Sequence, residues 1–246
     1  MVTKNDIKFI KSLKLKKNRI QQGLFCVEGS KNVIELITSG QLEIVRLIGT
    51  ISFEEQIGAL GELGSLRMER INQRDLEAMS NFQTNNSVIA LVKIPDKQHV
   101  PTVEEQCIVL DGVRDPGNLG TIIRTMDWFG FTSLICSEDC VDLYNPKTIS
   151  ATMGSFARVD VHYLDLKNFI TANQERKVFA MVLDGKPMSS LEASEGIYLL
   201  GNESQGIREE LMPFIDEKIT IPKRGSAESL NVAIAHAMMV YHLKAL

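Results

Sequence analysis

Residues 221–238 read IPKRGSAESLNVAIAHAM, and they are the most informative stretch of the chain. A β-branched segment ends at Pro222, a polar loop with a glycine follows, and Glu228 and Ser229 precede an alanine-rich apolar run. This order predicts a strand, a loop and a helix with Ser229 as its N-cap. Because the first turn of a helix has unpaired N–H groups, the loop is a candidate site for a small molecule. By itself, the pattern favours the simpler interpretation, a capped helix near the C-terminus.

The composition is typical of a protein with a full hydrophobic core. Of the 246 residues 44% are hydrophobic, which is enough for one large domain or two small ones. The net charge of -4 does not indicate nucleic-acid binding. Residues 1–19, however, have seven cationic side chains and only one acidic one, Asp6, so this segment is either a solvated basic helix or an arm that contacts nucleic acid. The seven are Lys4, Lys8, Lys11, Lys14, Lys16, Lys17 and Arg19.

Membrane and zinc proteins are disfavoured by the sequence. The amino end lacks the apolar region of a secretory signal, and no apolar run is long enough to cross a bilayer, so we expect a soluble, cytoplasmic protein. Cys136 and Cys140 do not have the C-x-x-C spacing of zinc or redox pairs. We therefore expect these two residues, together with Cys26 and Cys107, to be buried thiols.

Two α/β units are predicted from the alternation of strand-like and helical patterns. We place the first at residues 1–95, a polar linker at 96–105, and the second unit at 106–246. In the first unit, strands are expected at 24–28, 44–48 and 88–93, and helices at 31–38, 53–63 and 74–79.

The second unit is predicted to contain a mostly parallel sheet with helices on both faces. Strands are expected at 107–110, 133–136, 178–183, 196–200 and 218–221, and helices at 120–129, 166–173, 207–212 and 230–243.

Two further loops follow predicted strands of the second unit. The loop after residue 110 leads to Asn118 and Arg124, and the loop after residue 200 contains Gly201 and Glu203. Ligands of open α/β sheets bind beyond the carboxyl ends of the strands, where both loops must lie. Neither loop has the spacing G-x-G-x-x-G or G-x-x-x-x-G-K-[ST], so the spacing does not support dinucleotide or triphosphate binding.

Three segments resemble, in order, the signature motifs of the SpoU (TrmH) RNA 2'-O-methyltransferases of the SPOUT (α/β-knot) superfamily. They are residues 118–124, residues 201–203 and residues 221–233. Residues 145–147 and 151–159 also resemble the middle segment of the family, and residues 23–29 are similar to the start of a substrate-binding domain found in many members. The resemblance covers nearly the whole chain, strongly after residue 106 and more loosely before it.

This resemblance implies a small N-terminal α/β substrate-binding domain and a C-terminal α/β domain with a deep trefoil knot. It also implies a homodimer that binds S-adenosylmethionine in the knot loops, with each active site near the subunit interface. The positions that match the family's cofactor contacts are Gly201, Ile221 and Leu230, and Leu183 is a further candidate.

The resemblance also implies catalytic positions and a reaction. Asn118, Glu203, Ser229 and Asn231 are expected to organise the pocket and the substrate ribose, and no metal is required because the sulfonium is itself a good leaving group. Arg124 is expected either to help remove the hydroxyl proton or to orient a substrate phosphate. A guanidinium stays protonated and offers a planar fork of donors, so phosphate orientation is the physically safer role.

The main functional hypothesis is therefore methylation of a ribose 2'-hydroxyl in structured RNA. The two-domain layout favours ribosomal RNA over transfer RNA, by analogy alone. Three alternatives stay open: a non-catalytic RNA-binding or ribosome-assembly factor, a tRNA 2'-O-methyltransferase, and a methyltransferase that acts on another position or on a small molecule.

Overall fold

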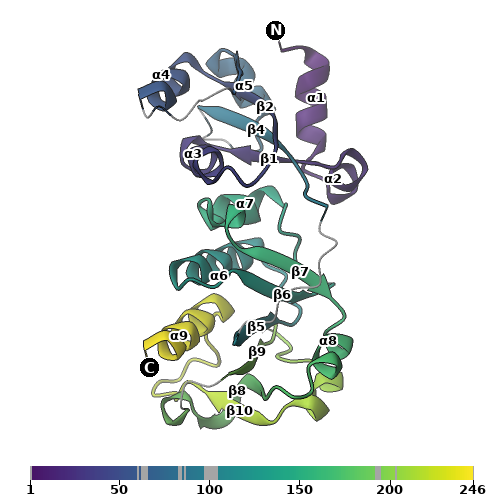
Figure 1. Cartoon of the computed structure of the whole chain (residues 1–246), viewed down its shortest axis with the longest axis vertical. Helices are drawn as coiled ribbons and strands as arrows, with labels where there is room; N and C mark the ends of the chain where they lie inside the picture. The colour runs from purple at the N-terminus through teal and green to yellow at the C-terminus, as the bar shows by residue number, and fades with distance from the viewer. Residues whose placement is uncertain are drawn as a thin grey trace. The chain divides into compact units, whose positions relative to one another are not determined.

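The computed structural model describes residues 2–59, 61, 66–82, 85, 87–96, 105–191, 195–202 and 204–245. The chain forms two compact units, both drawn in Figure 1. One consists of Met1–Gln98 and Asp142–Arg158, the other of His99–Val141 and Val159–Leu246. Most of the expected linker, residues 97–104, lies outside the described residues. The proposed domain boundaries stay a prediction, and the grouping of residues 142–158 with the first unit was not foreseen.

The first unit is built on a four-stranded sheet in the order β1-β4-β2-β3. β4 is antiparallel to both of its neighbours, whereas β2 and β3 are parallel. The three longer strands were predicted, and the three-residue β3 is too short for an alternating pattern to be read. The strands are β1 (Leu24–Glu28), β2 (Ile44–Gly49), β3 (Met68–Arg70) and β4 (Val88–Lys93). The helices are α1 (Lys4–Ser12), α2 (Lys16–Gln22), α3 (Ser30–Ser39), α4 (Ile51–Ala59), α5 (Gln73–Met79) and α7 (Pro146–Thr152), with the short η1 (Ser155–Ala157).

The basic N-terminal segment forms two docked helices, which corrects the idea of a free arm. Ile10 and Leu13 are fully buried in the hydrophobic core of the first unit. Asp6 of α1 accepts a 2.6 Å hydrogen bond from Arg46 of β2, which ties the helix to the sheet. The six lysines of the segment remain exposed, whereas Arg19 is buried and donates to the carbonyl of Leu13 at 2.7 Å.

Residues 142–158 supply part of the core of the first unit. The ring of Phe25 in β1 lies 4.5 Å from that of Tyr144 and 6.2 Å from that of Phe156, measured between centroids. Arg19 forms an ion pair with Asp142. These contacts join residues 142–158 to β1 and α2, and no local sequence pattern predicts such long-range packing.

The second unit contains a six-stranded sheet in the order β10-β8-β9-β5-β6-β7. All neighbouring strands are parallel, which agrees with the predicted parallel sheet. The strands are β5 (Gln106–Leu110), β6 (Ser133–Ser137), β7 (Asp160–Leu164), β8 (Val178–Pro187), β9 (Gly196–Leu200) and β10 (Glu217–Thr220). The chain starts in the middle of this sheet and adds strands first on one side and then on the other, so the direction of strand addition reverses between β5 and β9.

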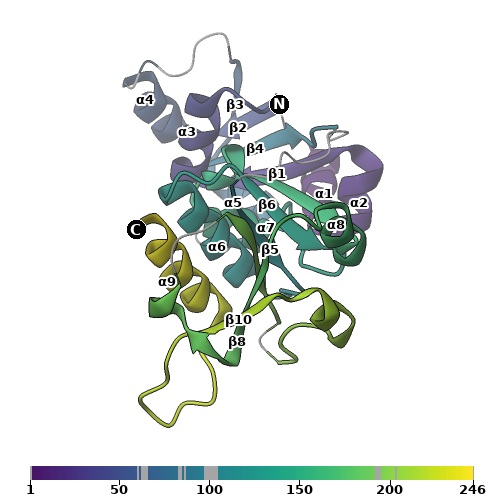
Figure 2. The same cartoon turned by 60° about the horizontal axis from the view of Figure 1, so that its bottom comes forward.

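Helices cover both faces of the parallel sheet. The residues of α8 and η3 pack on one face, in a core that includes Val109 and Leu199. In Figures 1 and 2, α6 and α9 lie side by side on the opposite face. The helices are α6 (Pro116–Trp128), α8 (Leu166–Ala172) and α9 (Val232–Ala245), with the short η2 (Met188–Ser190) and η3 (Glu209–Phe214).

Two predictions at helix ends were wrong. The segment expected as a helix at 207–212 is instead the 3-10 turn η3, two residues later. The last helix begins at Val232, and its N-cap is Asn231 and not Ser229. The Asn231 Oδ1 atom accepts hydrogen bonds from the amides of Ala233 at 2.9 Å and Ile234 at 3.3 Å, whereas Ser229 lies two residues earlier in the loop.

The expectation for the cysteines is confirmed. All four cysteines are free and buried. Within the described ranges, no helix has both the length and the apolar character needed to span a membrane.

Candidate active site

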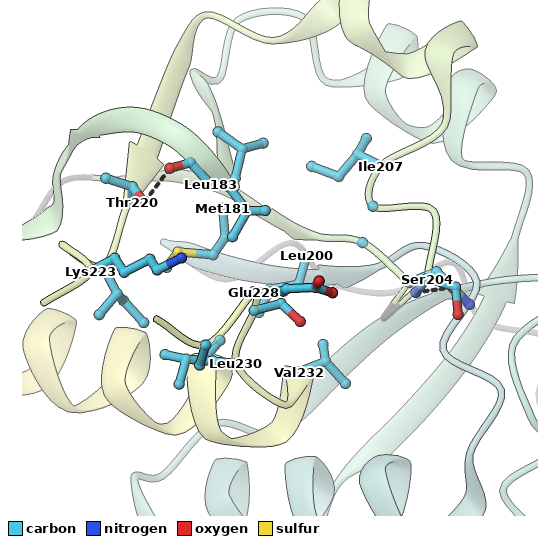
Figure 3. Close-up of a pocket in the computed structure, with 18 of the residues that line it drawn as sticks. Met181, Leu183, Leu200, Ser204, Ile207, Thr220, Lys223, Glu228, Leu230 and Val232 are labelled. Atoms are coloured by element: carbon cyan, nitrogen blue, oxygen red, sulfur yellow. Dashed lines mark hydrogen bonds between the residues drawn. The ribbon is translucent and has the colours of Figure 1, made fainter. Parts of the chain in front are cut away.

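A cavity of about 610 Å³ lies beyond the carboxyl ends of β9 and β10. Its walls come from residues 181–183 in the middle of β8, the loop after β9, the loop after β10 and the start of α9 (Figure 3). This volume is in the range of small-molecule and cofactor sites, roughly 300–1,000 Å³. The described part of the second unit thus has a ligand-sized cavity where parallel sheets usually bind ligands.

All four predicted cofactor positions, Gly201, Ile221, Leu230 and Leu183, line this cavity. Ser229 lines it too. The Leu183 side chain is 77% exposed, although leucine is usually buried, and Leu230 is also exposed. Figure 3 shows these two side chains on different walls of the cavity, where apolar surface is available to a ligand.

An irregularity in the pairing of β8 with β10 forms the Leu183 wall. Lys218 pairs with Ala180, but the next residue, Ile219, pairs with Lys186, so residues 181–185 bulge out of the ladder. The Thr220 hydroxyl donates to the Leu183 carbonyl at 3.2 Å and holds the bulge in place. Such bulges are common next to active sites because they redirect side chains.

The loop after β9 forms a tight turn that requires glycine. Asn202 and Gly206 exchange two backbone hydrogen bonds of 2.9 Å. A Cβ atom on Gly201 would lie 2.2 Å from the backbone carbon of Gly206, so no other residue fits there without moving the loop. The predicted catalytic residue Glu203 belongs to this loop but lies outside the described residues.

Asn118 and Asn231 meet at the first turns of two helices. The Nδ2 atom of Asn231 donates to Oδ1 of Asn118 at 2.9 Å. α6 begins with Pro116, and its N-cap Asp115 accepts a 2.8 Å hydrogen bond from the Asn118 amide. Since Asn231 follows Leu230 directly, the pair adjoins the cavity without lining it.

Arg124 is exposed on α6, about 9 Å of helix rise beyond Asn118. It makes no hydrogen bond or ion pair with the described residues, and it does not line the cavity. The structure therefore brings Asn118 and Asn231 together and leaves the guanidinium of Arg124 available to another molecule.

Sequence reasoning missed an ion pair between the buried Asp111 and the partly exposed Arg208, neither of which lines the cavity. Asp111 is 1% exposed at the end of β5, and its carboxylate accepts hydrogen bonds from the amide of Arg208 at 2.8 Å and from the Arg208 Nε atom at 2.6 Å. Asp139 lies 3.6 Å from the same guanidinium. The signal in the sequence was an aspartate directly after an apolar strand, a place where an unpaired carboxylate would be costly.

Two neighbouring groups have shifted pKa values. A hydrogen bond from the Ser137 hydroxyl, with weaker contributions from Arg114 and Arg208, lowers the pKa of Asp139. Interaction with Cys136, followed by hydrogen bonds from Ser137 and the Val113 amide, lowers the pKa of Cys140 to about 7. Both groups contact the turn after β5, Asp139 through Arg114 and Cys140 through the Val113 amide. Neither group lines the cavity.

The lining of the cavity suits an organic ligand. Apolar side chains alternate with the backbone groups of two glycine-containing loops, so the site can hold an aromatic or aliphatic part together with polar groups. Among the described residues, no cluster of three or more histidine, cysteine, aspartate or glutamate residues could hold a metal ion.

Comparisons with known proteins agree with this architecture. Residues 105–241 match the model of the SpoU rRNA Methylase family, and residues 4–90 match the MRM3-like substrate binding domain. The chain is 31% identical to the 23S rRNA (guanosine(2553)-2'-O)-methyltransferase RlmP of Bacillus subtilis, over 97% of this chain and 95% of that protein.

Two solved structures are similar over their whole length. A TrmH-family protein from Porphyromonas gingivalis is 32% identical, with a TM-score of 0.87 over 100% of this chain and 99% of the other. An AdoMet-bound rRNA methyltransferase from Sinorhizobium meliloti is 29% identical, with a TM-score of 0.84 over 100% and 96%. The predicted fold class, a small N-terminal α/β domain followed by an α/β-knot domain, is confirmed. The chain belongs to the SpoU rRNA methylase family.

Proposed function

We propose that the protein is an S-adenosylmethionine-dependent methyltransferase that modifies a ribose 2'-hydroxyl in structured ribosomal RNA. The main observation behind this proposal is that one cavity is lined by residues from three separate segments: Gly201, Ile221, Leu230 and Leu183. The AdoMet-bound relative from Sinorhizobium meliloti and the 23S rRNA enzyme RlmP support the cofactor and the substrate class. We also propose a cytoplasmic location for the protein.

The residues of the cavity fit S-adenosylmethionine. Leu183 and Leu230 offer apolar surface for the adenine, while the backbone groups at Gly201 and Ile221 offer donors and acceptors for its polar atoms. When bound, the cofactor supplies an activated methyl group on a positively charged sulfur.

Catalysis in this site depends mainly on positioning. Alignment of two reacting groups in one site contributes several kcal/mol to rate acceleration, roughly 7–11 kcal/mol in the best cases. Asn118, Asn231 and Ser229 orient the ribose, and Glu203 belongs to the same proposed set. Arg124 binds the substrate phosphate next to the reacting ribose, because its exposed guanidinium is a permanent cation with a planar fork of donors.

The active form is a homodimer that pairs through α6 and α9. Ile234, Met238 and Tyr241 are exposed on α9 at positions i, i+4 and i+7, so they form one stripe. The adjoining α6 contributes Trp128, which is 84% exposed. A contiguous apolar surface of this kind is typical of an interface, and a second copy offers the same surface in a two-fold arrangement.

RNA binds to the exposed lysines of α1 and α2 in the first unit. Lys4, Lys8 and Lys11 project from α1, and Lys14, Lys16 and Lys17 follow them. The match of residues 4–90 to a substrate binding domain supports this assignment. Because contacts to phosphates release counterions, this binding should weaken steeply with salt.

The deciding experiment is transfer of a radiolabelled methyl group to RNA from a strain in which the gene is deleted. Ribosomal RNA should be labelled at a ribose 2'-oxygen, and Arg124→Ala should abolish the transfer while cofactor binding persists. Labelling of transfer RNA alone would mean that the substrate is transfer RNA and not ribosomal RNA. Failure of the wild-type protein to bind S-adenosylmethionine in calorimetry would instead indicate a non-catalytic RNA-binding protein.

A further inference from the structure

Both ends of the loop after β9 are held by one residue, Asp111. At the start of the loop, the Asp111 amide donates to the carbonyl of Leu200 at 2.8 Å. At its end, the Asp111 carboxylate accepts from the Arg208 amide at 2.8 Å. Asp111 therefore closes the base of the loop between residues 201 and 207.

The guanidinium of Arg208 strengthens this closure. Its Nε atom donates to the Asp111 Oδ1 atom at 2.6 Å, so the two carboxylate oxygens bind the backbone and the side chain of one residue. Hydrogen bonds to an ionised group are about twice as strong as neutral ones. Asp111 is 1% exposed, so solvent has little access to its carboxylate, whereas the Arg208 side chain is 40% exposed.

Residues of the loop after β9 line the cavity, whereas Asp111 and Arg208 do not. Gly201, Gly206 and Ile207 line the cavity, and Ile207 directly precedes the clamped amide of Arg208. A second contact lies nearby, because the side chain of Asn202 donates to the carbonyl of Gly112. A displacement of Arg208 would therefore move a cavity wall.

We propose that Asp111, acting through Arg208, is a positioning residue that holds Gly206 and Ile207 in the arrangement that binds the cofactor. This inference rests on the proposed function for the identity of the cofactor. The contacts between Asp111 and Arg208, called the clamp below, preform the cavity wall, so binding of the cofactor does not have to supply the free energy of ordering the loop.

The test is Asp111→Asn, which has the same shape but no charge. We expect the Kd for S-adenosylmethionine, measured by calorimetry, to rise at least tenfold. The KM for the cofactor should rise in parallel, with kcat and the KM for RNA changed less than threefold. A role in global stability alone would lower the melting temperature and leave Kd and KM unchanged when they are measured well below that temperature, and this result would overturn the proposal.

Asp139→Asn is the matched control. Asp139 lies 3.6 Å from the Arg208 guanidinium but is partly exposed, and its carboxylate receives no bond from the Arg208 amide. We expect its Kd for the cofactor to change less than threefold. A loss as large as that of Asp111→Asn would indicate a general electrostatic effect and contradict the clamp.

The double variant Asp111→Asn with Arg208→Gln tests whether the two residues act through one contact. Its Kd should be close to that of Asp111→Asn alone, because residues in direct contact are not additive. An increase in Kd for the double variant that equals the product of the increases for the two single variants would contradict the proposal.

Hydrogen exchange separates this proposal from the proposed function. In the protein without any ligand, Asp111→Asn should accelerate exchange of the amides at residues 206–208 at least tenfold, with the amides of β5 unchanged. This result would support the clamp even if S-adenosylmethionine were the wrong ligand, and unchanged exchange would refute the clamp even if methylation were demonstrated.

Discussion

Asn231 uses both ends of its side-chain amide at once. Its Oδ1 atom caps α9 by accepting from the Ala233 amide at 2.9 Å, and its Nδ2 atom donates to Asn118 Oδ1 at 2.9 Å. One residue thus begins the last helix and ties it to the first turn of α6. The two roles can be separated by mutation, because only the second requires a donor.

Asn231→Asp should keep the cap and lose the bond to Asn118, because a carboxylate accepts but cannot donate. We expect a melting temperature within about 2 °C of wild type, while methyl transfer falls at least tenfold. Asn231→Ala removes both bonds and should also cost about 1 kcal/mol of stability, which is typical of a lost N-cap. Thermal unfolding and methylation rates measured side by side distinguish the two. Equal activity of Asn231→Asp and wild type would exclude a role for the pair.

Gly201→Ala should abolish cofactor binding. The new Cβ would lie 2.2 Å from the backbone carbon of Gly206, and only a shift of the loop can relieve this overlap. Gly225→Ala is the control, because Gly225 also lines the cavity but has open space at its Cβ position. Calorimetry with S-adenosylmethionine should detect no binding to the first variant and a change below threefold for the second. Wild-type affinity of Gly201→Ala would mean that the loop does not form the binding wall.

Tyr241→Glu combined with Met238→Glu should convert the proposed dimer to a monomer. Each charge would be buried in the proposed interface without a partner, which is costly. The molar mass by light scattering should fall to about half. Ile20→Glu is the control, since Ile20 is an exposed apolar residue of the first unit, and it should leave the molar mass unchanged. A wild-type protein that is monomeric at micromolar concentration would contradict the dimer.

Lys8→Gln with Lys11→Gln should weaken RNA binding and reduce its dependence on salt. Deleting residues 1–19 is not a usable test, because Ile10 and Leu13 belong to the core. Each lost phosphate contact should reduce the slope of log K against log salt by about 1. Lys93→Gln is the control, because Lys93 is exposed on β4 and pairs with Glu43 at 3.0 Å. An unchanged slope in the double variant would mean that RNA binds elsewhere.

The sequence predicted the sheet from local patterns, and the family resemblance predicted several residues of the cavity. Alternating strand and helix signals gave the parallel sheet, and the motif match placed Gly201, Ile221, Leu230 and Leu183 on one cavity. The bulge at residues 181–185 was not predictable, because it depends on how β8 pairs with β10. Nor was the clamp between Asp111 and Arg208, whose partners are 97 residues apart.

The helix boundary at Asn231 illustrates a different limit. The sequence predicted Ser229 as the N-cap, but serine and asparagine are both good N-caps, and the structure uses Asn231. The bond from Asn231 to Asn118 favours the later start, and it exists only once α6 and α9 are packed together. Similarly, residues 142–158 join the first unit through Phe25 and Tyr144, a contact that no periodicity encodes.

His236 makes the stability of the protein depend on pH. The side chain is fully buried in α9, neither ring nitrogen has a hydrogen-bond partner in the described ranges, and burial lowers its pKa from 6.5 to about 3. The unfolded chain takes up a proton below pH 6.5, whereas the folded protein does not until about pH 3. The contribution to stability is therefore complete above pH 6.5 and is lost as the pH falls towards 3, by about 1.4 kcal/mol for each pH unit.

Replacement of this histidine should remove that dependence. Urea unfolding of His236→Leu at pH 7 and pH 5 should show a free energy of unfolding that falls by about 2 kcal/mol less over this interval than that of wild type. The control is His242→Gln on the same helix, where the His242 side chain contacts the Leu191 carbonyl at 3.0 Å. This variant should keep the part of the pH dependence of unfolding free energy that is due to His236. Parallel pH profiles of wild type and His236→Leu would show that His236 is protonated in the folded protein at these pH values or is accessible to solvent.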